Sequence, residues 1–421
     1  MIRFAVLSFP GTTGENETVR AFQRSGMEAE VVLWNDSGLL KGSRLDEFDG
    51  YCLAGGISYG DRGRGGVIAA HQPIMEMVRK EATKGKVVLG IGNGAQILVE
   101  SGLIPGYDNH SVACAVSSVG SDPESQSGWH ALRNVAPKNR SAFNRFTGVL
   151  HLPVAPGMGR FVFGDSKVLE AIKKNGQIVF RYSDPIKGVV SDSQVSESIA
   201  ALCNPAGNVL AILSHPERDP QGGGNPFFKS IREWVETRSK ADYSSLGLHQ
   251  GAEDIRPFEP ADIEFIVRLM SVDIEKRTVE ATLKAKDIKV DLKRYTYWSA
   301  KLKPGVGGIE AAEKIIGSGE LANLNKDWVY VRMGDRAYQC TEGGRLQPID
   351  LDSSGWLVVR NKENQMGNAK MKEIRQCGVD FLESLDCGKL WEVKNADEQA
   401  IYEIIRTKIL YNQNSMFIMK N

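Results

Sequence analysis

The chain carries the stretch Val88-Leu89-Gly90-Ile91-Gly92-Asn93-Gly94-Ala95-Gln96, in which an apolar run ends abruptly in glycine and polar residues. The apolar run predicts a buried strand, and the glycines after it predict a sharp turn into a helix. A strand-to-helix turn of this kind holds a side chain in the open at the N-terminus of a helix. We therefore interpret residues 88–96 as the centre of an α/β fold, with Gly92 in the turn.

Strand and helix signals alternate on both sides of this stretch. Strands are predicted at 2–7, 28–33, 50–54 and 86–91, and helices at 17–25 and 67–83. This alternation predicts a doubly wound, mostly parallel sheet, whose sites form where strands end and helices begin.

Two other segments are predicted to lie beside Gly92. Gly55 and Gly56 follow a strand, where their backbone N–H groups could form an oxyanion hole. His215 and Glu217 follow the apolar strand 209–213 and could act as a base and its orienting partner. Each segment alone is typical of an ordinary turn or surface loop, so it is their order and spacing together that favour a site.

Composition sets the broad class of the protein. A chain of 421 residues is too long for one ordinary core, so we expect two or three domains. Lysine plus arginine equals aspartate plus glutamate, 52 each, which favours neither nucleic acid nor anionic lipid as a partner. The six cysteines show no CxxC spacing, and no apolar run is long enough to span a membrane. We expect a cytoplasmic protein without a metal site.

The pattern changes beyond residue 238. Residues 239–260 are rich in Ser, Gly, Asp, Glu and Pro and are interpreted as a linker. Short runs typical of strands follow at 265–270, 279–283 and 295–302. Two later blocks, 294–340 and 356–393, share a plan of strand, helix and strand pair, the second with strands at 379–385 and 389–393. We predict two related α+β modules of ferredoxin-like character, 261–350 and 351–421.

The domain 1–238 resembles the small glutaminase subunits of phosphoribosylformylglycinamidine synthases, class I glutamine amidotransferases of purine biosynthesis. The matching motifs are Phe9-Pro10-Gly11-Thr12, Gly55-Gly56-Ile57-Ser58-Tyr59-Gly60-Asp61, Leu152-Pro153-Val154-Ala155, Gly159-Arg160-Phe161, Gly207-Asn208-Val209-Leu210 and His215-Pro216-Glu217-Arg218. The resemblance implies a flavodoxin-like glutaminase in which a cysteine attacks the glutamine amide, with Gly55, Gly56, Asn93 and Gln96 lining the binding site. It also implies an ATP-dependent synthetase subunit as partner. ATP and Mg²⁺ are expected there, because this chain has no GxxxxGK[ST] phosphate loop and no expected cofactor of its own.

The chain departs from this family at the nucleophile. Where the family has glycine, isoleucine, cysteine, asparagine and glycine, this chain has Gly92 in place of the cysteine. A glycine cannot form the thioester, so we expect glutaminase activity to be lost, although glutamine could still bind. The family's His-Gly-Glu-Gly run is also replaced, by Pro156-Gly157-Met158-Gly159. Three alternatives stay open: a natural pseudoenzyme subunit, an active purine enzyme carrying an engineered Gly92, and a scaffold that only binds other proteins.

Residues 356–421 resemble the very small third subunit of the same synthase. The matching motifs are Gly388-Lys389-Leu390-Trp391-Glu392-Val393 and Lys408-Ile409-Leu410-Tyr411-Asn412, with Leu302-Lys303-Pro304-Gly305-Val306 resembling that subunit's opening turn. The resemblance implies that two subunits are fused here, which would raise their effective concentration. Separately, small α+β modules with exposed sheet edges often associate through those edges, so we expect self-association through the C-terminal modules.

Overall fold

The computed structural model describes residues 1–107, 110–118, 127–154, 158–183, 198–219, 226–239, 251–259, 261–394 and 396–420. The chain divides into two compact units, Met1–Ala252 and Glu253–Asn421. Most of the predicted linker, 240–250 and residue 260, lies outside the described residues.

The first unit is built on a nine-stranded sheet with the order β2-β1-β3-β4-β11-β10-β9-β6-β7. Five parallel strands form one half of it: β1 Arg3–Ser8, β2 Glu28–Leu33, β3 Gly50–Leu53, β4 Val87–Ile91 and β11 Val209–Ile212. Their order is the 2-1-3-4-5 arrangement of flavodoxin-like folds, which confirms the predicted fold class.

Antiparallel pairs, which were not predicted, extend the sheet through β10 Ile199–Cys203, β9 Ile178–Tyr182, β6 Gly128–Asn134 and β7 Val149–Val154. A separate pair consists of β5 Ala115–Ser118 and β8 Met158–Val162.

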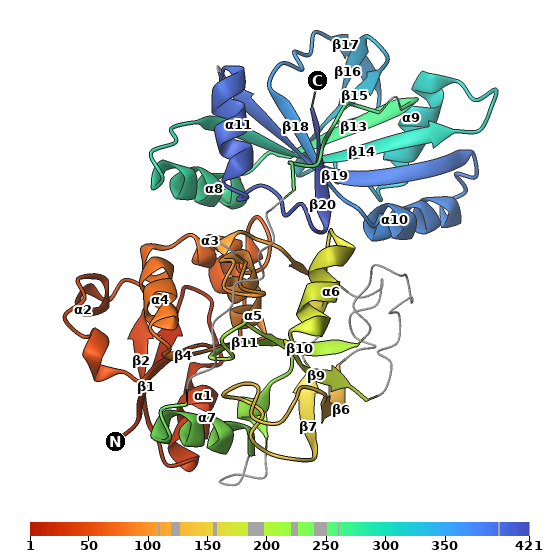
Figure 1. The fold of residues 1–421 in the computed structure, drawn as a ribbon. Helices are drawn as coiled ribbons and strands as arrows, with labels where there is room; N and C mark the ends of the chain where they lie inside the picture. Colours follow the sequence, from red (N-terminus) through yellow and green to blue (C-terminus); the bar gives the residue numbers. More distant parts are fainter. Residues whose placement is uncertain are drawn as a thin grey trace. The chain divides into compact units, whose positions relative to one another are not determined.

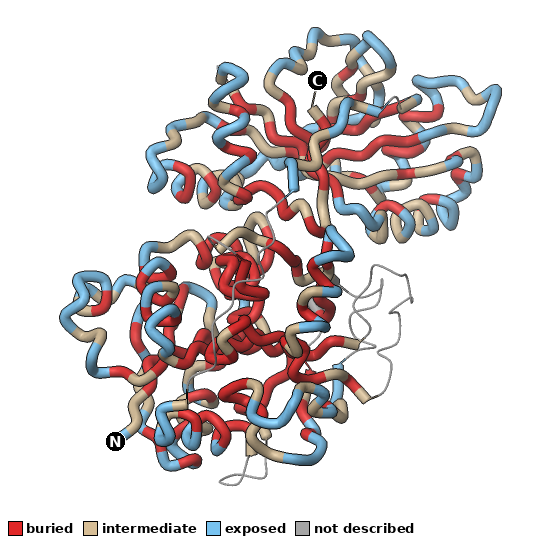
Figure 2. The backbone as a smooth tube through the Cα atoms, viewed as in Figure 1, coloured by how far each residue is buried: buried red, intermediate tan, exposed pale blue. Residues whose placement is uncertain are grey.

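Helices cover both faces of this sheet (Figure 1). Along β1 the side chains alternate, so that Phe4 and Val6 enter one core while Ala5 and Leu7 enter the other. The first core is closed by α1 Glu15–Arg24 and α7 Pro226–Glu236, and the second by α4 Pro73–Thr83, α5 Asn93–Glu100 and α6 Ser166–Lys174. Figure 2 shows that the buried residues follow the central strands and the inner faces of these helices.

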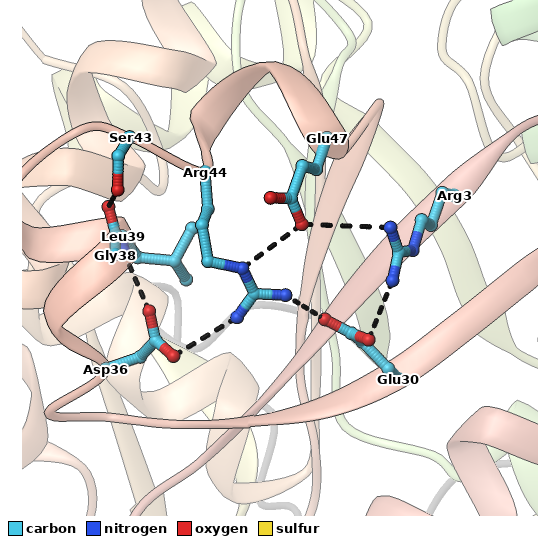
Figure 3. A network of polar contacts seen from close by, with 8 residues as sticks. All are labelled: Arg3, Glu30, Asp36, Gly38, Leu39, Ser43, Arg44 and Glu47. Atoms are coloured by element: carbon cyan, nitrogen blue, oxygen red, sulfur yellow. Dashed lines mark hydrogen bonds and ion pairs between the residues drawn. The ribbon is translucent and has the colours of Figure 1, made fainter.

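An ion-pair network fixes the segment after β2 to the sheet (Figure 3). The Arg44 guanidinium contacts three carboxylates, those of Glu30, Asp36 and Glu47, and Arg3 reaches the other oxygen of Glu30 at 2.8 Å. Asp36 also caps the short helix α2 Ser37–Leu40. Because these side chains remain partly exposed, we attribute to the network a modest share of the stability.

The second unit also contains a nine-stranded sheet, with the order β12-β20-β18-β19-β14-β13-β15-β16-β17. Its strands are β12 Ile255–Arg256, β13 Ile263–Leu269, β14 Asp291–Leu302, β15 Asp327–Met333, β16 Arg336–Cys340, β17 Leu346–Ile349, β18 Trp356–Asn361, β19 Leu382–Lys394 and β20 Met416–Lys420. Its helices are α8 Ile274–Lys284, α9 Gly308–Gly317, α10 Gln365–Gln376 and α11 Glu398–Arg406.

The two halves of the second unit repeat one plan. Each half runs strand, helix, strand, helix, strand, as β13-α8-β14-α9-β15 and as β18-α10-β19-α11-β20. In each half the first strand lies between the second and the third, and the two second strands, β14 and β19, pair with each other antiparallel. The turns before the last strands also match, since Asn325 N donates to Asn323 Oδ1 and Asn414 N donates to Asn412 Oδ1, both at 3.0 Å.

The two halves share a hydrophobic core. Phe265 and Ile315 of the first half belong to the same buried cluster as Ile374 and Leu385 of the second. The predicted modules, 261–350 and 351–421, thus contribute to one sheet and one core, and their boundary at residue 350 stays a prediction.

Four predicted elements differ from the structure. Residues 279–283 lie in α8 and not in a strand, because Asp273 caps a helix that begins upstream by accepting from Lys276 N at 2.9 Å. The predicted strands 379–385 and 389–393 are replaced by the single strand β19, in which Gly388 lets β18 approach closely: a Cβ there would lie 2.8 Å from Val359 O. The predicted helix 67–83 is broken before Pro73 into α3 Val67–Ala70 and α4.

Candidate functional site

The three segments singled out in the sequence follow three neighbouring strands. Gly55 follows β3, Gly92 follows β4 and His215 follows β11, and these strands are adjacent and parallel in the sheet. Because the carboxyl ends of parallel strands lie at one edge, the predicted residues are brought together there.

Gly92 occupies a sharp turn between β4 and α5. Its backbone has φ 53° and ψ −110°, and its N–H donates to Ile212 O at 2.9 Å, which ties the turn to β11. A non-glycine residue adopts such a backbone only at a cost, and this conformation is typical of turns that present a nucleophile. The turn therefore has the shape the resemblance implies, without the side chain.

His215 lies against this turn and is oriented by Glu217. The Nδ1 atom of His215 is 2.7 Å from Glu217 Oε1, and both residues are buried. On the other side of the ring, a Cβ placed on Gly92 would lie 3.1 Å from Cε1 and 3.3 Å from Nε2. The imidazole thus faces the position from which a side chain at residue 92 would extend.

Gly55 and Gly56 are held by the loop that follows β1. Gly55 O accepts from Thr13 N at 3.0 Å and from Gly14 N at 3.1 Å. Gly56 has φ 144°, and a Cβ on it would lie 2.6 Å from Gly11 O, so only glycine fits. These contacts explain the motif at residues 9–12, although the direction of the Gly56 N–H toward an oxyanion stays a prediction.

Asn93 connects the glycine loop to the N-terminus of α5. Its Oδ1 accepts from Ser58 N at 2.9 Å, and its Nδ2 donates to Asp61 Oδ1 at 3.1 Å and to Gln96 Oε1 at 2.7 Å. Gln96 also packs on the loop, because a Cβ on Gly65 would lie 2.6 Å from its Oε1. In this structure the amide groups of both predicted binding residues are engaged in holding the loop.

A buried ion pair beneath this loop was not predicted. Arg64 Nε and Nη2 donate to the two carboxylate oxygens of Glu100, at 2.7 and 2.6 Å, and both side chains are buried. No local sequence pattern pairs residues that are 36 positions apart. The only visible signal is that Arg64 lies in a glycine-rich loop, which brings its backbone close to neighbouring elements. Asp61, in the same loop, is partly buried. Burial raises the pKa of its carboxyl group, and the hydrogen bond from Asn93 opposes this effect.

Cys52 is the cysteine of β3, the strand that ends just before Gly55. Its side chain is fully buried within β3. Burial, reinforced by the negative charge of Glu217, raises the pKa of the thiol well above its usual value. The thiolate needed for attack is therefore disfavoured.

Metal ligands, membrane spans and residues 156–158 were also considered. Among the described residues no cluster of three or more His, Cys, Asp or Glu side chains could hold a metal ion, and no described helix is long and apolar enough to cross a membrane. Pro156 and Gly157, and the side chain of Met158, lie outside the described residues. The predicted change from the family's His-Gly-Glu-Gly run therefore stays a prediction.

Comparisons with known proteins match the first unit. A family model of the CobB/CobQ-like glutamine amidotransferase domain matches residues 1–241, more than half of the chain. The chain is 38% identical to phosphoribosylformylglycinamidine synthase subunit PurQ of Methanothrix thermoacetophila over 264 residues, which cover 56% of this chain and 99% of that relative. It is 36% identical to the subunit of the same name from Pyrococcus furiosus over 247 residues, 56% of this chain and 100% of the relative. A solved structure of PurLQS from Thermotoga maritima aligns with 56% of this chain and 99% of that chain, at 29% identity and a TM-score of 0.44. Through residues 1–241, the chain belongs to the family of CobB/CobQ-like glutamine amidotransferase domains.

Proposed function

We propose that this chain is the amidotransferase-type subunit of a phosphoribosylformylglycinamidine-synthase-like complex, and that it has lost glutaminase activity because Gly92 stands where the nucleophile belongs. The observation that carries the proposal is the position of His215, whose Nε2 lies 3.3 Å from the Cβ that Gly92 lacks. The relatives described above, which are subunits of phosphoribosylformylglycinamidine synthases, support the choice of complex.

The missing step is the first covalent one. A glutaminase of this kind needs a thiolate to attack the side-chain amide carbon of glutamine, and a base to take the thiol proton. His215 and Glu217 have the arrangement of such a base and its partner, at 2.7 Å. With no thiol at residue 92, His215 has no proton to remove and no thioester forms.

The glycine loop and Asn93 remain in place, which favours retained binding of glutamine or of a similar amide at this edge of the sheet. Gly55 and Gly56 are fixed by the loop after β1, and Asn93 holds Ser58 and Asp61. Because none of these contacts involves a side chain at residue 92, the binding site can persist without the nucleophile.

We also propose that the second unit corresponds to a third synthase subunit fused to the first. The repeated strand–helix–strand–helix–strand plan supports this, because two copies of one small module supply six of the nine strands of the sheet. The synthetase subunit, with its ATP and Mg²⁺, would be a separate chain that receives ammonia from solution.

Reconstitution tests the proposal. The full chain is mixed with the synthetase subunit from the same source, and product formation is measured with glutamine and, separately, with ammonium chloride as nitrogen donor. We expect a stable complex that is active with ammonium and inactive with glutamine. Glutamine-dependent synthesis would contradict the loss of activity, and failure to associate would favour a scaffold with other partners.

A further inference from the structure

The imidazole of His215 has one nitrogen engaged and one nitrogen open. Its Nδ1 atom lies 2.7 Å from Glu217 Oε1. Because an ionised carboxylate only accepts hydrogen bonds, Nδ1 carries the proton and Nε2 presents a lone pair. Among the residues that the structure describes, no group forms a hydrogen bond with Nε2. The ring is therefore held in the form that accepts a proton at Nε2.

Two glycines border the open edge of this ring. A Cβ on Gly92 would lie 3.3 Å from Nε2, and a Cβ on Gly55 would lie 3.0 Å from Cε1, so a side chain at either position would cover the edge. Gly92 is also partly exposed to solvent. A Cβ is fixed at one point by the backbone, whereas a water molecule is free to settle at hydrogen-bond distance from Nε2, about 2.8 Å. Water can therefore reach Nε2 beside the turn.

A donor for negative charge lies next to this edge. Asn93 follows Gly92 directly and is the first residue of α5. Within the ranges that the structure describes, its backbone N–H has no hydrogen-bond partner. The N-terminus of a helix favours negative charge, and an N–H there can donate to the oxygen of a tetrahedral intermediate. A base, a place for water and a donor for an oxyanion thus lie at one turn.

We propose that this site hydrolyses γ-esters of glutamate by direct attack of water, without a covalent intermediate. The proton that a thiol does not supply here comes from water: Nε2 of His215 takes it as the water oxygen bonds to the ester carbon, and the Asn93 N–H donates to the carbonyl oxygen. The bond from that carbon to the alcohol oxygen then breaks, and the proton passes from Nε2 to the leaving alkoxide. One ester and one water give glutamate and an alcohol. The choice of glutamate rests on the proposed binding of glutamine at this edge of the sheet.

Esters and amides differ in how far they need a thiolate. An ester carbonyl is more electrophilic than an amide carbonyl, and an alkoxide leaves more readily than an amine. A general base contributes about 10²–10⁴ in rate, whereas loss of the nucleophile costs on the order of 10⁶ in a triad enzyme. A base that acts on water is therefore enough for an ester, while hydrolysis of glutamine stays at background.

The test measures glutamate formed from L-glutamate γ-methyl ester by the full chain. The rate is compared with those of His215→Ala and Gly92→Ala, and with a control, His151→Ala, which replaces an exposed histidine of β7. Mass spectrometry of the chain during turnover detects any acyl adduct. Glutamine binding is measured by calorimetry on the same preparations, and circular dichroism verifies that every variant is folded.

We expect the unaltered chain and His151→Ala to form glutamate at equal rates, at least about 100-fold faster than His215→Ala. Gly92→Ala should also lose the activity, because its Cβ presses on the ring and covers Nε2, and no acyl adduct should form. Equal rates in the unaltered chain and either His215→Ala or Gly92→Ala, or an acyl adduct on any residue, would overturn the proposal.

The two proposals fail in different ways. If glutamine binds but the ester is not hydrolysed, attack by water is refuted and the function proposed for the complex is untouched. If the ester is not hydrolysed and glutamine does not bind, the retained binding site is refuted as well.

Discussion

The imidazole of His215 faces Gly92, with its Nε2 3.3 Å from the point where a Cβ on Gly92 would stand. The same ring is held from behind by Glu217, 2.7 Å from Nδ1. A contact of 3.1 to 3.3 Å is tighter than most Cβ contacts, so a side chain at residue 92 fits only if the ring moves by a few tenths of an ångström. The space between the turn at Gly92 and the His215 ring is therefore too narrow for a Cβ without a small shift of the ring.

The first prediction concerns the strain in this turn. Gly92→Ala should lower the free energy of unfolding by about 2–3 kcal/mol, because φ 53° and ψ −110° are unfavourable for alanine and its Cβ would press on His215. Gly60→Ala is the control, since Gly60 has φ 66° and ψ 30° and its nearest neighbour is 3.9 Å away, so it should cost about 1 kcal/mol. Urea unfolding of the full chain measures both. Equal costs at the two positions would show that the turn at Gly92 is relaxed.

The second prediction concerns the hydrogen bonds of Asn93. Asn93→Ala removes the acceptor of Ser58 N and the donor to Asp61 and Gln96, which should cost about 1–3 kcal/mol and loosen the glycine loop. Hydrogen exchange at the Ser58 amide should accelerate, while amides within β2, far along the sheet, keep their rates. Unchanged exchange at Ser58 would mean that the loop is held by its contacts with residues 9–14 alone.

The parallel sheet and the residues gathered at its edge could be predicted from sequence, because both depend on local order. The glycines after β3 and β4 and the pair His215–Glu217 after β11 each follow an apolar run, so knowing that the strands are parallel places them together. The strong local pattern of apolar and polar residues also explains why a strand was wrongly predicted at residues 279–283. Residues 279–283 alternate in a way typical of a strand, and only the cap at Asp273 reveals the helix.

What the sequence could not predict depends on contacts between distant residues. The pair Arg64–Glu100 joins a loop to the last residue of α5, and the engagement of Gln96 with Gly65 depends on how closely the loop approaches. The predicted repeat began only at residue 294 in the first half, because reading residues 279–283 as a strand left β13 and α8 out of that block. Each of these features follows from packing and not from a local pattern.

The third prediction concerns the buried pair Arg64–Glu100. Either Arg64→Ala or Glu100→Ala leaves a buried charge without its partner and should cost about 3–5 kcal/mol. The double variant Arg64→Met with Glu100→Leu should cost less than either single change, since no charge is left buried. Urea unfolding gives the free energy of unfolding of all three variants. If the double variant loses as much as the two single variants together, the two side chains are not coupled.

The fourth prediction concerns Cys52. Because burial holds the pKa of its thiol well above the usual value, Cys52 should resist a thiol-alkylating reagent at pH 8 in the folded chain, whereas exposed Cys377 should react within minutes. Mass spectrometry of tryptic peptides identifies the labelled residues. Rapid labelling of Cys52 would reopen the question of a second nucleophile at the site.

The central claim is tested most directly by ammonia release from glutamine, measured for the chain as it stands and for its Gly92→Cys, Gly92→Ala and His215→Ala variants. Loss of the nucleophile costs on the order of 10⁶ in rate in a well-studied triad enzyme, so restoring a thiol should raise hydrolysis far above background even if His215 must first move aside. We expect the unaltered chain, Gly92→Ala and His215→Ala to be alike and inactive, and Gly92→Cys alone to form ammonia. Ammonia release by the unaltered chain clearly above that of His215→Ala would contradict the account.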